Sequence, residues 1–331
     1  MEINEKFIPY WMKGTDNSVA LYSSIKCVRN YKDRNFPAGK KQFNNSDSVK
    51  LTDDILSEKI SDGTVKKIDL EQLSINELVM MQKVRILPNL RISELKKLTI
   101  YTYDNGQVFL LLNYMDHLTF YSYGQGGMIK KAYSNLKKFL KLFDIKYFAV
   151  DEKKRFLTSS IEYFGTGMKC FSVLTLAGLR VKNKFPEIIS YLSQNSYSNK
   201  KYFGFGSSLD DLIIIMNKDS LTLTENKIVE NHYNFLKLLS EETKLNSLTN
   251  NELNDIYIKT KRIMSAELLS FKSFMEAYNL ITLLVGYNKI KKIRISELNK
   301  TLSILIINLP RVIHSARVKR KLIENLIRKL D

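Results

Sequence analysis

Apolar and polar residues alternate along much of the first two thirds of the chain, and this period of two predicts β-strands. We predict strands at residues 20–31, 96–103, 107–114, 116–124 and 211–218, and residues 168–179 are apolar throughout. The turn residues Asp104, Asn105 and Gly106 separate two of these runs, which is a strong hairpin signal. Because a hairpin joins antiparallel strands, we expect an antiparallel sheet.

Apolar residues spaced three and four apart predict helices elsewhere, at residues 51–60, 74–87, 128–143, 185–195 and 224–245. Ser74 and Glu77 have the spacing of a capping box, and Pro186 stands near the start of its helix, where proline is favoured. From about residue 250 onward the pattern is helical only. We therefore predict an α+β fold, an antiparallel sheet flanked by helices, followed by an all-helical C-terminal domain.

The same pattern gives the domain organisation. We expect an irregular N-terminal segment with one strand at 1–50, an α+β domain at 51–245 and a helical domain at 250–331. The chain has 331 residues, of which 44% are hydrophobic and 11% aromatic, so most of it should be globular. No apolar run approaches the roughly 18–20 residues that span a bilayer, so we expect no membrane association. Cys27 and Cys170 are too few for a disulfide framework or a metal site, which favours a reducing cytoplasm.

The formal net charge of +18 implies attraction to polyanions, namely nucleotide phosphates, nucleic acid or an acidic protein face. An equally simple interpretation is solubility, because the lysines are spread along the chain. A basic nucleic-acid-binding protein is therefore one hypothesis, and it predicts binding that weakens steeply with salt. The aromatic residues lie mostly in apolar strands rather than among exposed basic residues, which disfavours it.

A few local features bear on chemistry. The glycine-containing turns at 164–169 and 203–208 each have a lysine nearby, which suits phosphate oxygens, although a purely structural turn is the simpler interpretation. Asn113, Asp116 and His117 follow a buried strand, where active sites often lie. The chain has no Walker motif, no paired-cysteine zinc spacing and no nucleophile elbow.

Taken together and in order, these segments resemble a known family. The stretches are YSSIKCVRN, QKVRILPNL, LLNYMDHLTF, AVDEKKRFLTSSIEYFGTGMK and KKYFGFGSS. They follow the layout of the ATP:guanidino phosphotransferases, and most closely that of the bacterial protein-arginine kinases. The resemblance extends from about Tyr22 to Asn288 and implies the guanidino-kinase catalytic fold.

The resemblance also implies the site. It assigns cofactor-binding positions to Ser24, Lys26, Asn113, His117, Lys169 and Lys200. Where the family has arginines that clamp the triphosphate, this chain has three lysines and two neutral residues, Ser24 and Thr119, and lysine keeps a charge but loses the bidentate fork. We therefore expect binding of ATP and Mg²⁺ to be weakened or lost.

The family's carboxylates fall on Tyr114, Met115 and Phe205. In guanidino phosphorylation a carboxylate orients the guanidinium and takes its proton, and a general base alone contributes ~10²–10⁴ in rate. We therefore expect a pseudokinase that has lost catalysis. The alternative is an active protein-arginine kinase with an atypical site, in which Glu162 or Asp116 serves the guanidinium.

The resemblance extends to partners and to the tail. It implies a protein partner, namely an active kinase paralogue, an adaptor or a Clp-type protease component, and self-association as a homodimer. In the tail, Arg317, Arg320 and Lys321 echo a phospho-arginine receptor signature, although a solvated basic helix face is the simpler interpretation. The preferred hypothesis is a regulatory or adaptor protein that acts by binding.

Overall fold

An antiparallel sheet organises the part of the chain that the computed structural model describes. That part comprises residues 19–37, 46–83, 85–176, 179, 182–201, 212–245, 248–265, 271–286, 289–290, 293 and 298. Within it, eight strands form one sheet in the order β2-β3-β4-β5-β1-β6-β8-β7, and all pairings are antiparallel. The predicted α+β class and antiparallel sheet are confirmed.

The strands have the following bounds: β1 Ala20–Arg29, β2 Val65–Ile68, β3 Thr99–Tyr103, β4 Val108–Leu112, β5 Leu118–Gln125, β6 Met168–Thr175, β7 Tyr197–Lys201 and β8 Leu212–Asn217. Strand β1 pairs with β5 on one side and β6 on the other, so the segment before residue 50 supplies a central strand of the sheet. The predicted hairpin joins β3 to β4, and Asp104, Asn105 and Gly106 all have positive φ, as such a turn requires.

Strands β2 and β7 were not expected from the sequence. Both lie at the edges of the sheet, and each contains two lysines in a run of four or five residues. Edge strands face water on one side and tolerate charge, so their hydrophobic pattern is too weak to predict them.

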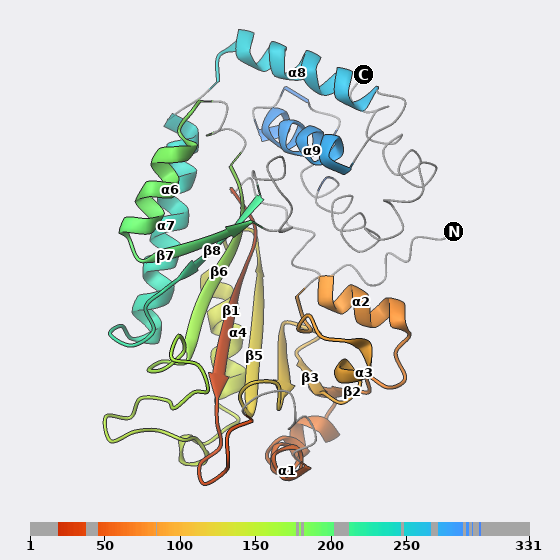
Figure 1. Cartoon of the computed structure of the whole chain (residues 1–331), viewed down its shortest axis with the longest axis vertical. Helices are drawn as coiled ribbons and strands as arrows, with labels where there is room; N and C mark the ends of the chain where they lie inside the picture. The colour runs from red at the N-terminus through yellow and green to blue at the C-terminus, as the bar shows by residue number, and fades with distance from the viewer. Residues whose placement is uncertain are drawn as a thin grey trace.

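Helices lie between the strands in the chain order and follow the last strand (Figure 1). Their bounds are α1 Ser46–Ser61, α2 Ile75–Lys83, α3 Ile92–Leu95, α4 Ile129–Leu140, η3 Ile145–Tyr147, α6 Phe185–Gln194, α7 Glu225–Leu245, α8 Asn250–Met264 and α9 Phe271–Gly286. The predicted capping box begins α2, since the Ser74 amide donates to Glu77 Oε2 at 2.8 Å and the Glu77 amide donates back to Ser74 Oγ at 3.3 Å. None of the described helices is long and apolar enough to cross a membrane.

The two faces of the sheet have different coverings (Figure 1). On one face, which we call the helix face, Ile25 and Cys27 of β1 pack in a cluster with Leu136 of α4 and Ile228 of α7. On the other, the site face, Tyr22 belongs to a cluster that also includes apolar residues of α2, α3, α8 and α9. Side chains alternate along β1, so Ser24 and Lys26 lie on the site face with Tyr22.

A buried hydrogen-bond chain fastens α7 to the helix face. His232 is fully buried, its Nε2 lies 2.8 Å from Ser172 Oγ, and Ser172 Oγ lies 2.8 Å from Ser23 Oγ. Ser23 donates its proton to the Gly126 carbonyl at 2.8 Å, so Ser172 donates to Ser23 and His232 Nε2 donates to Ser172. His232 Nδ1 is then the buried acceptor, and it has no partner among the described residues.

This arrangement makes stability depend on pH. Burial lowers the pKa of His232 from 6.5 to about 3, so the unfolded chain takes up a proton before the folded one does. The stability that comes from burying a neutral His232 is fully present above about pH 6.5. As the pH falls, the free energy of unfolding decreases by up to about 1.4 kcal/mol per pH unit. We expect urea unfolding to show this loss between about pH 7 and about pH 5. The variant His232→Gln should have a shallower pH dependence, and an unchanged one would contradict the assignment.

Candidate functional site

Strand pairing brings two lysines together on the site face. Lys26 of β1 stands opposite Tyr121 of β5 on one side and Lys169 of β6 on the other. Directly opposed side chains on one face of an antiparallel pair lie about 5 Å apart at Cβ. Two of the six cofactor-binding positions that the family resemblance implies are therefore neighbours in the sheet.

Tyrosine rings surround the ammonium group of Lys26. Its Nζ lies 4.6 Å from the centroid of the Tyr163 ring and 6.0 Å from that of Tyr121. Burial lowers the pKa of Lys26, and the charges of Asp116 and Glu162 act in the opposite direction. The ammonium therefore makes cation–π contacts with the tyrosine rings, and such contacts become stronger as water is excluded. The two carboxylates attract it through their charges.

The ammonium group of Lys169 is buried and hydrogen-bonded to a backbone carbonyl. Its side chain is 1% exposed, and its Nζ donates a short hydrogen bond to the carbonyl of Lys218. Burial lowers the pKa of Lys169, and Glu162 and Asp219 oppose that shift. A lysine in this position supports the β6–β8 connection, and at least one of its donors is used inside the protein.

The β4–β5 turn contains several of the predicted site residues. Asp116 Oδ1 accepts hydrogen bonds from Asn30 Nδ2 and from the Ser159 amide, both at 2.7 Å. The His117 amide donates to Asn30 Oδ1 at 2.8 Å, and His117 Nδ1 accepts from the Tyr31 amide at 3.2 Å. Both side chains are buried, so they position the turn against the end of β1.

Asn113 also serves the turn. It has φ of 55°, its amide donates to the His117 carbonyl at 3.0 Å, and its Oδ1 accepts from Ser48 Oγ of α1 at 2.7 Å. Between these fixed points, Tyr114 is partly buried against the site-face cluster and Met115 is 45% exposed. The turn is thus fixed by buried hydrogen bonds, and between its fixed residues it presents a phenol and a thioether.

The remaining predicted residues are placed as follows. Ser24 is half-buried on the site face opposite Tyr123 and Phe171. Glu162 is exposed, and its carboxylate makes no hydrogen bond or ion pair within the described residues, although its charge acts on both site lysines. Lys200 is exposed on the edge strand β7. It lies three strands across the sheet from Lys26 and is offset from it by four residues along the strands, so the two residues are about 20 Å apart. Phe205, Arg317, Arg320 and Lys321 lie outside the described residues.

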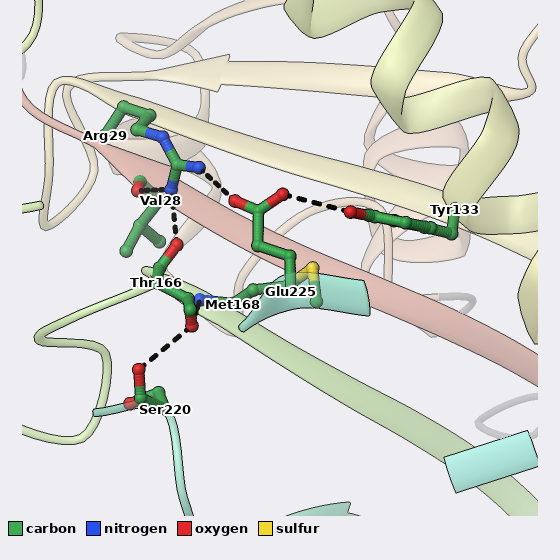
Figure 2. Close-up of polar contacts among 7 residues, drawn as sticks. All are labelled: Val28, Arg29, Tyr133, Thr166, Met168, Ser220 and Glu225. Atoms are coloured by element: carbon green, nitrogen blue, oxygen red, sulfur yellow. Dashed lines mark hydrogen bonds and ion pairs between the residues drawn. The ribbon is translucent and has the colours of Figure 1, made fainter. Parts of the chain in front are cut away.

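An ion pair that the sequence did not reveal lies at the end of β1 on the helix face (Figure 2). Arg29 Nη2 donates to Glu225 Oε1 at 2.7 Å, and Arg29 Nη1 donates to the carbonyls of Val28 and Thr166, both at 2.8 Å. Tyr133 of α4 donates to the second carboxylate oxygen of Glu225 at 3.3 Å. This contact therefore joins β1, α4, the first turn of α7 and the loop before β6.

The Gly165–Thr166–Gly167 turn is engaged in the fold. The Thr166 amide donates to the Ser220 carbonyl at 2.8 Å, and the Gly165 amide donates to the Phe156 carbonyl at 3.3 Å. A Cβ at Gly165 would lie 2.4 Å from the Ser220 carbonyl oxygen, so only glycine fits. These contacts support the structural interpretation of the turn, because the two amides already have acceptors inside the protein.

Comparisons with known proteins agree with this geometry. Lombricine kinase has a similar fold, with a TM-score of 0.57 and 14% identity over 73% of this chain and 70% of that one. The duplicated taurocyamine kinase from Schistosoma mansoni gives a TM-score of 0.54 and 15% identity over 80% of this chain and 40% of that one. The fold is therefore that of the guanidino kinases.

Sequence comparisons give the family. Residues 48–245 match the protein family described as "ATP:guanido phosphotransferase, C-terminal catalytic domain". A protein-arginine kinase of Bacillus cereus is 24% identical over 254 residues, covering 73% of this chain and 70% of that protein. One from Bacillus anthracis is 23% identical with the same coverage. The chain belongs to the ATP:guanido phosphotransferase family.

The close approach at Gly165 gives a stability prediction. Gly165 has φ of +106°, and Gly63, at the end of α1, has φ of +75° with nothing within 4 Å of a built Cβ. We expect Gly165→Ala to lower the free energy of unfolding by about 2–3 kcal/mol, because strain and a backbone clash add together. Gly63→Ala should cost only about 1 kcal/mol, since strain acts alone. If chemical denaturation gave the same loss of unfolding free energy for both variants, the close approach of the Ser220 carbonyl would not add to the cost at Gly165.

Proposed function

We propose that this member of the family has lost phosphoryl transfer and acts by binding another protein. The observation that supports this most directly is the β4–β5 turn. Asn113, Asp116 and His117 hold the turn in place by buried hydrogen bonds, while Tyr114 and Met115 occupy the positions where the family has carboxylates.

The chemistry of the reaction explains why this matters. A guanidinium has a pKa above about 12, so its nitrogen attacks phosphorus only when a base takes a proton and holds the plane in line. Burial raises the pKa of Tyr114 further above its ordinary value of 10, so this phenol is neutral near pH 7. Met115 has no acid–base chemistry at all. Neither side chain replaces a carboxylate in orienting a cation or accepting its proton.

The described residues also do not fit a clamp for a triphosphate. Guanidino kinases use ATP with Mg²⁺, and bidentate arginines suit phosphate oxygens better than lysines do. Here the Lys26 ammonium lies against tyrosine rings, and Lys169 donates to a backbone carbonyl. We therefore derive no step through the nucleotide.

An active kinase with an atypical site is the competing function, and Glu162 is the observation in its favour. Its charge acts on both Lys26 and Lys169, and its carboxylate is exposed. The other candidate, Asp116, already accepts two hydrogen bonds from the protein. If the chain transfers phosphate, Glu162 is the residue that serves the guanidinium.

Exposed apolar side chains at the rim of the site support a protein partner. Ile161 is 83% exposed and Met115 is 45% exposed. Their loops are tied together, since Ser159 Oγ donates to the Met115 carbonyl at 2.7 Å. Exposed side chains of this kind act as anchors in protein interfaces. We propose as partners an active kinase of this family, an adaptor, a Clp-type protease component or a second copy of the chain.

A transfer assay tests the loss of activity. With [γ-³²P]ATP, Mg²⁺ and an arginine-rich protein, we expect a rate at least ~10²–10⁴ below that of the Bacillus cereus relative, because the general base is missing. Transfer near the rate of that relative would overturn the proposal. In that case Glu162→Gln would identify the carboxylate, and an unchanged rate in that variant would eliminate Glu162.

A photo-crosslinking amino acid at position 161 tests the binding surface. The matched control is position 75, because Ile75 on α2 is also a well exposed isoleucine, at 63%. In cells we expect a discrete protein adduct from position 161 that Met115→Asp removes. No adduct, or the same adduct from position 75, would show that the rim of the site is not the binding surface.

A further inference from the structure

Helix α4 presents a row of lysines to solvent. The exposed lysines are Lys130, Lys131, Lys137, Lys138 and, at the C-cap, Lys141. Their spacing of seven, eight and eleven residues places them on one side of the helix. The opposite side is buried against the helix face of the sheet, through residues that include Leu136 and Phe139.

These lysines have no carboxylate partners in the part of the chain that the structure describes. Helix α4 has no acidic residue, and the contacts made by its lysine heads are with rings: Lys130 Nζ lies 4.0 Å from the centroid of Tyr233, and Lys137 Nζ lies 5.3 Å from that of Tyr133. Other lysines of the chain are paired. Examples are Lys59 with Asp62 at 3.1 Å, Lys67 with Asp53 at 2.8 Å, Lys184 with Glu187 at 2.8 Å and Lys259 with Glu276 at 2.7 Å.

We propose that this lysine row binds the phosphate backbone of nucleic acid without reading its sequence. From Lys130 to Lys141 the row is about 17 Å long, and a duplex carries one phosphate per strand about every 3.4 Å of its axis, so a duplex segment of that length offers each of the five lysines a phosphate. The +18 net charge of the whole chain adds a long-range attraction of the same sign. Lysine supplies point charges rather than a base-reading fork, which fits backbone binding.

The surface chemistry favours nucleic acid over the other polyanions. Protein interfaces are depleted in lysine and depend on buried aromatic or apolar anchors. No large apolar side chain of Ile129–Leu140 is exposed. The exposed apolar neighbours of the row include Met128 at the N-cap, at 47%, and Tyr233 beside Lys130, at 37%, which is a small apolar area beside five lysines. A membrane-surface helix inserts its apolar side into lipid, but that side of α4 is already packed on the sheet.

The lysine row lies on the outer side of α4, which covers the helix face, whereas Lys26 lies on the site face. This inference is therefore independent of the proposed protein binding. The two can fail separately. A protein that binds DNA through α4 and still transfers phosphate would refute only the proposed loss of activity.

Fluorescence anisotropy with a labelled mixed-sequence duplex of about 20 base pairs tests the proposal. The test variant replaces Lys130, Lys131, Lys137 and Lys138 with glutamine. The matched control replaces the ion-paired Lys59, Lys67, Lys184 and Lys259 with glutamine, so both variants lose the same charge. Glutamine has nearly the helix propensity of lysine, and circular dichroism confirms that both variants fold.

We expect the affinity of the unmodified chain to fall by about two to three orders of magnitude between about 50 and about 200 mM salt. The α4 variant should bind at least about tenfold more weakly at the lower salt and show a flatter salt dependence, while the control resembles the unmodified chain. Equal losses in both variants would overturn the proposal, because overall charge would then explain the binding. Equally strong competition by polyglutamate, or tighter binding to phosphatidylserine vesicles, would overturn it as well.

Discussion

The ion pair between the buried guanidinium of Arg29 and the partly exposed carboxylate of Glu225 holds together the end of β1, the loop before β6, α4 and the start of α7. The Arg29 side chain is 3% exposed, and the face of Phe156 lies 3.5 Å from its guanidinium carbon. A charge this deep is costly unless it is paired and hydrogen-bonded. The two terminal nitrogens of Arg29 donate to three acceptors, while its buried Nε has no partner among the described residues. Gly167 makes room for it, because a Cβ there would lie 2.5 Å from Arg29 Nη1. One side chain therefore fixes the end of β1, the glycine turn and the start of α7.

The residues that hold the β4–β5 turn and the two residues between them are under different structural constraints. The hydrogen bonds that join Asn30 to Asp116 and His117 hold the turn, and removing one partner would leave buried polar atoms unpaired. Tyr114 and Met115 stand between these fixed points and meet no such requirement. The hydrogen bonds that hold this turn therefore do not depend on which side chains stand at positions 114 and 115.

The sequence predicted the elements whose signals are local. The hairpin at Asp104–Gly106 and the capping box at Ser74 are each specified within a few residues, and both are present. The edge strands β2 and β7 were missed because charged residues hide their period. The placement of Lys26 beside Lys169 depends on strand register, to which only the family resemblance pointed.

Contacts between distant residues could not be predicted at all. Arg29 and Glu225 are 196 positions apart, and no local pattern links them. The same holds for the carbonyl of Lys218, which engages Lys169 from 49 positions away. Such pairs are chosen by the packing of whole elements, and the sequence shows only that both residues are polar. Only the three-dimensional structure therefore shows that Lys169 donates a hydrogen bond inside the protein.

Calorimetric titration with Mg·ATP shows whether the site lysines, which the protein itself engages, are available to a nucleotide. We expect no saturable binding up to about 1 mM nucleotide, the upper end of common KM values, while the Bacillus cereus relative binds in the same buffer. Saturable binding at micromolar concentrations would contradict the proposed loss of phosphoryl transfer. Lys26 would then have to leave the rings of Tyr121 and Tyr163 to reach phosphate.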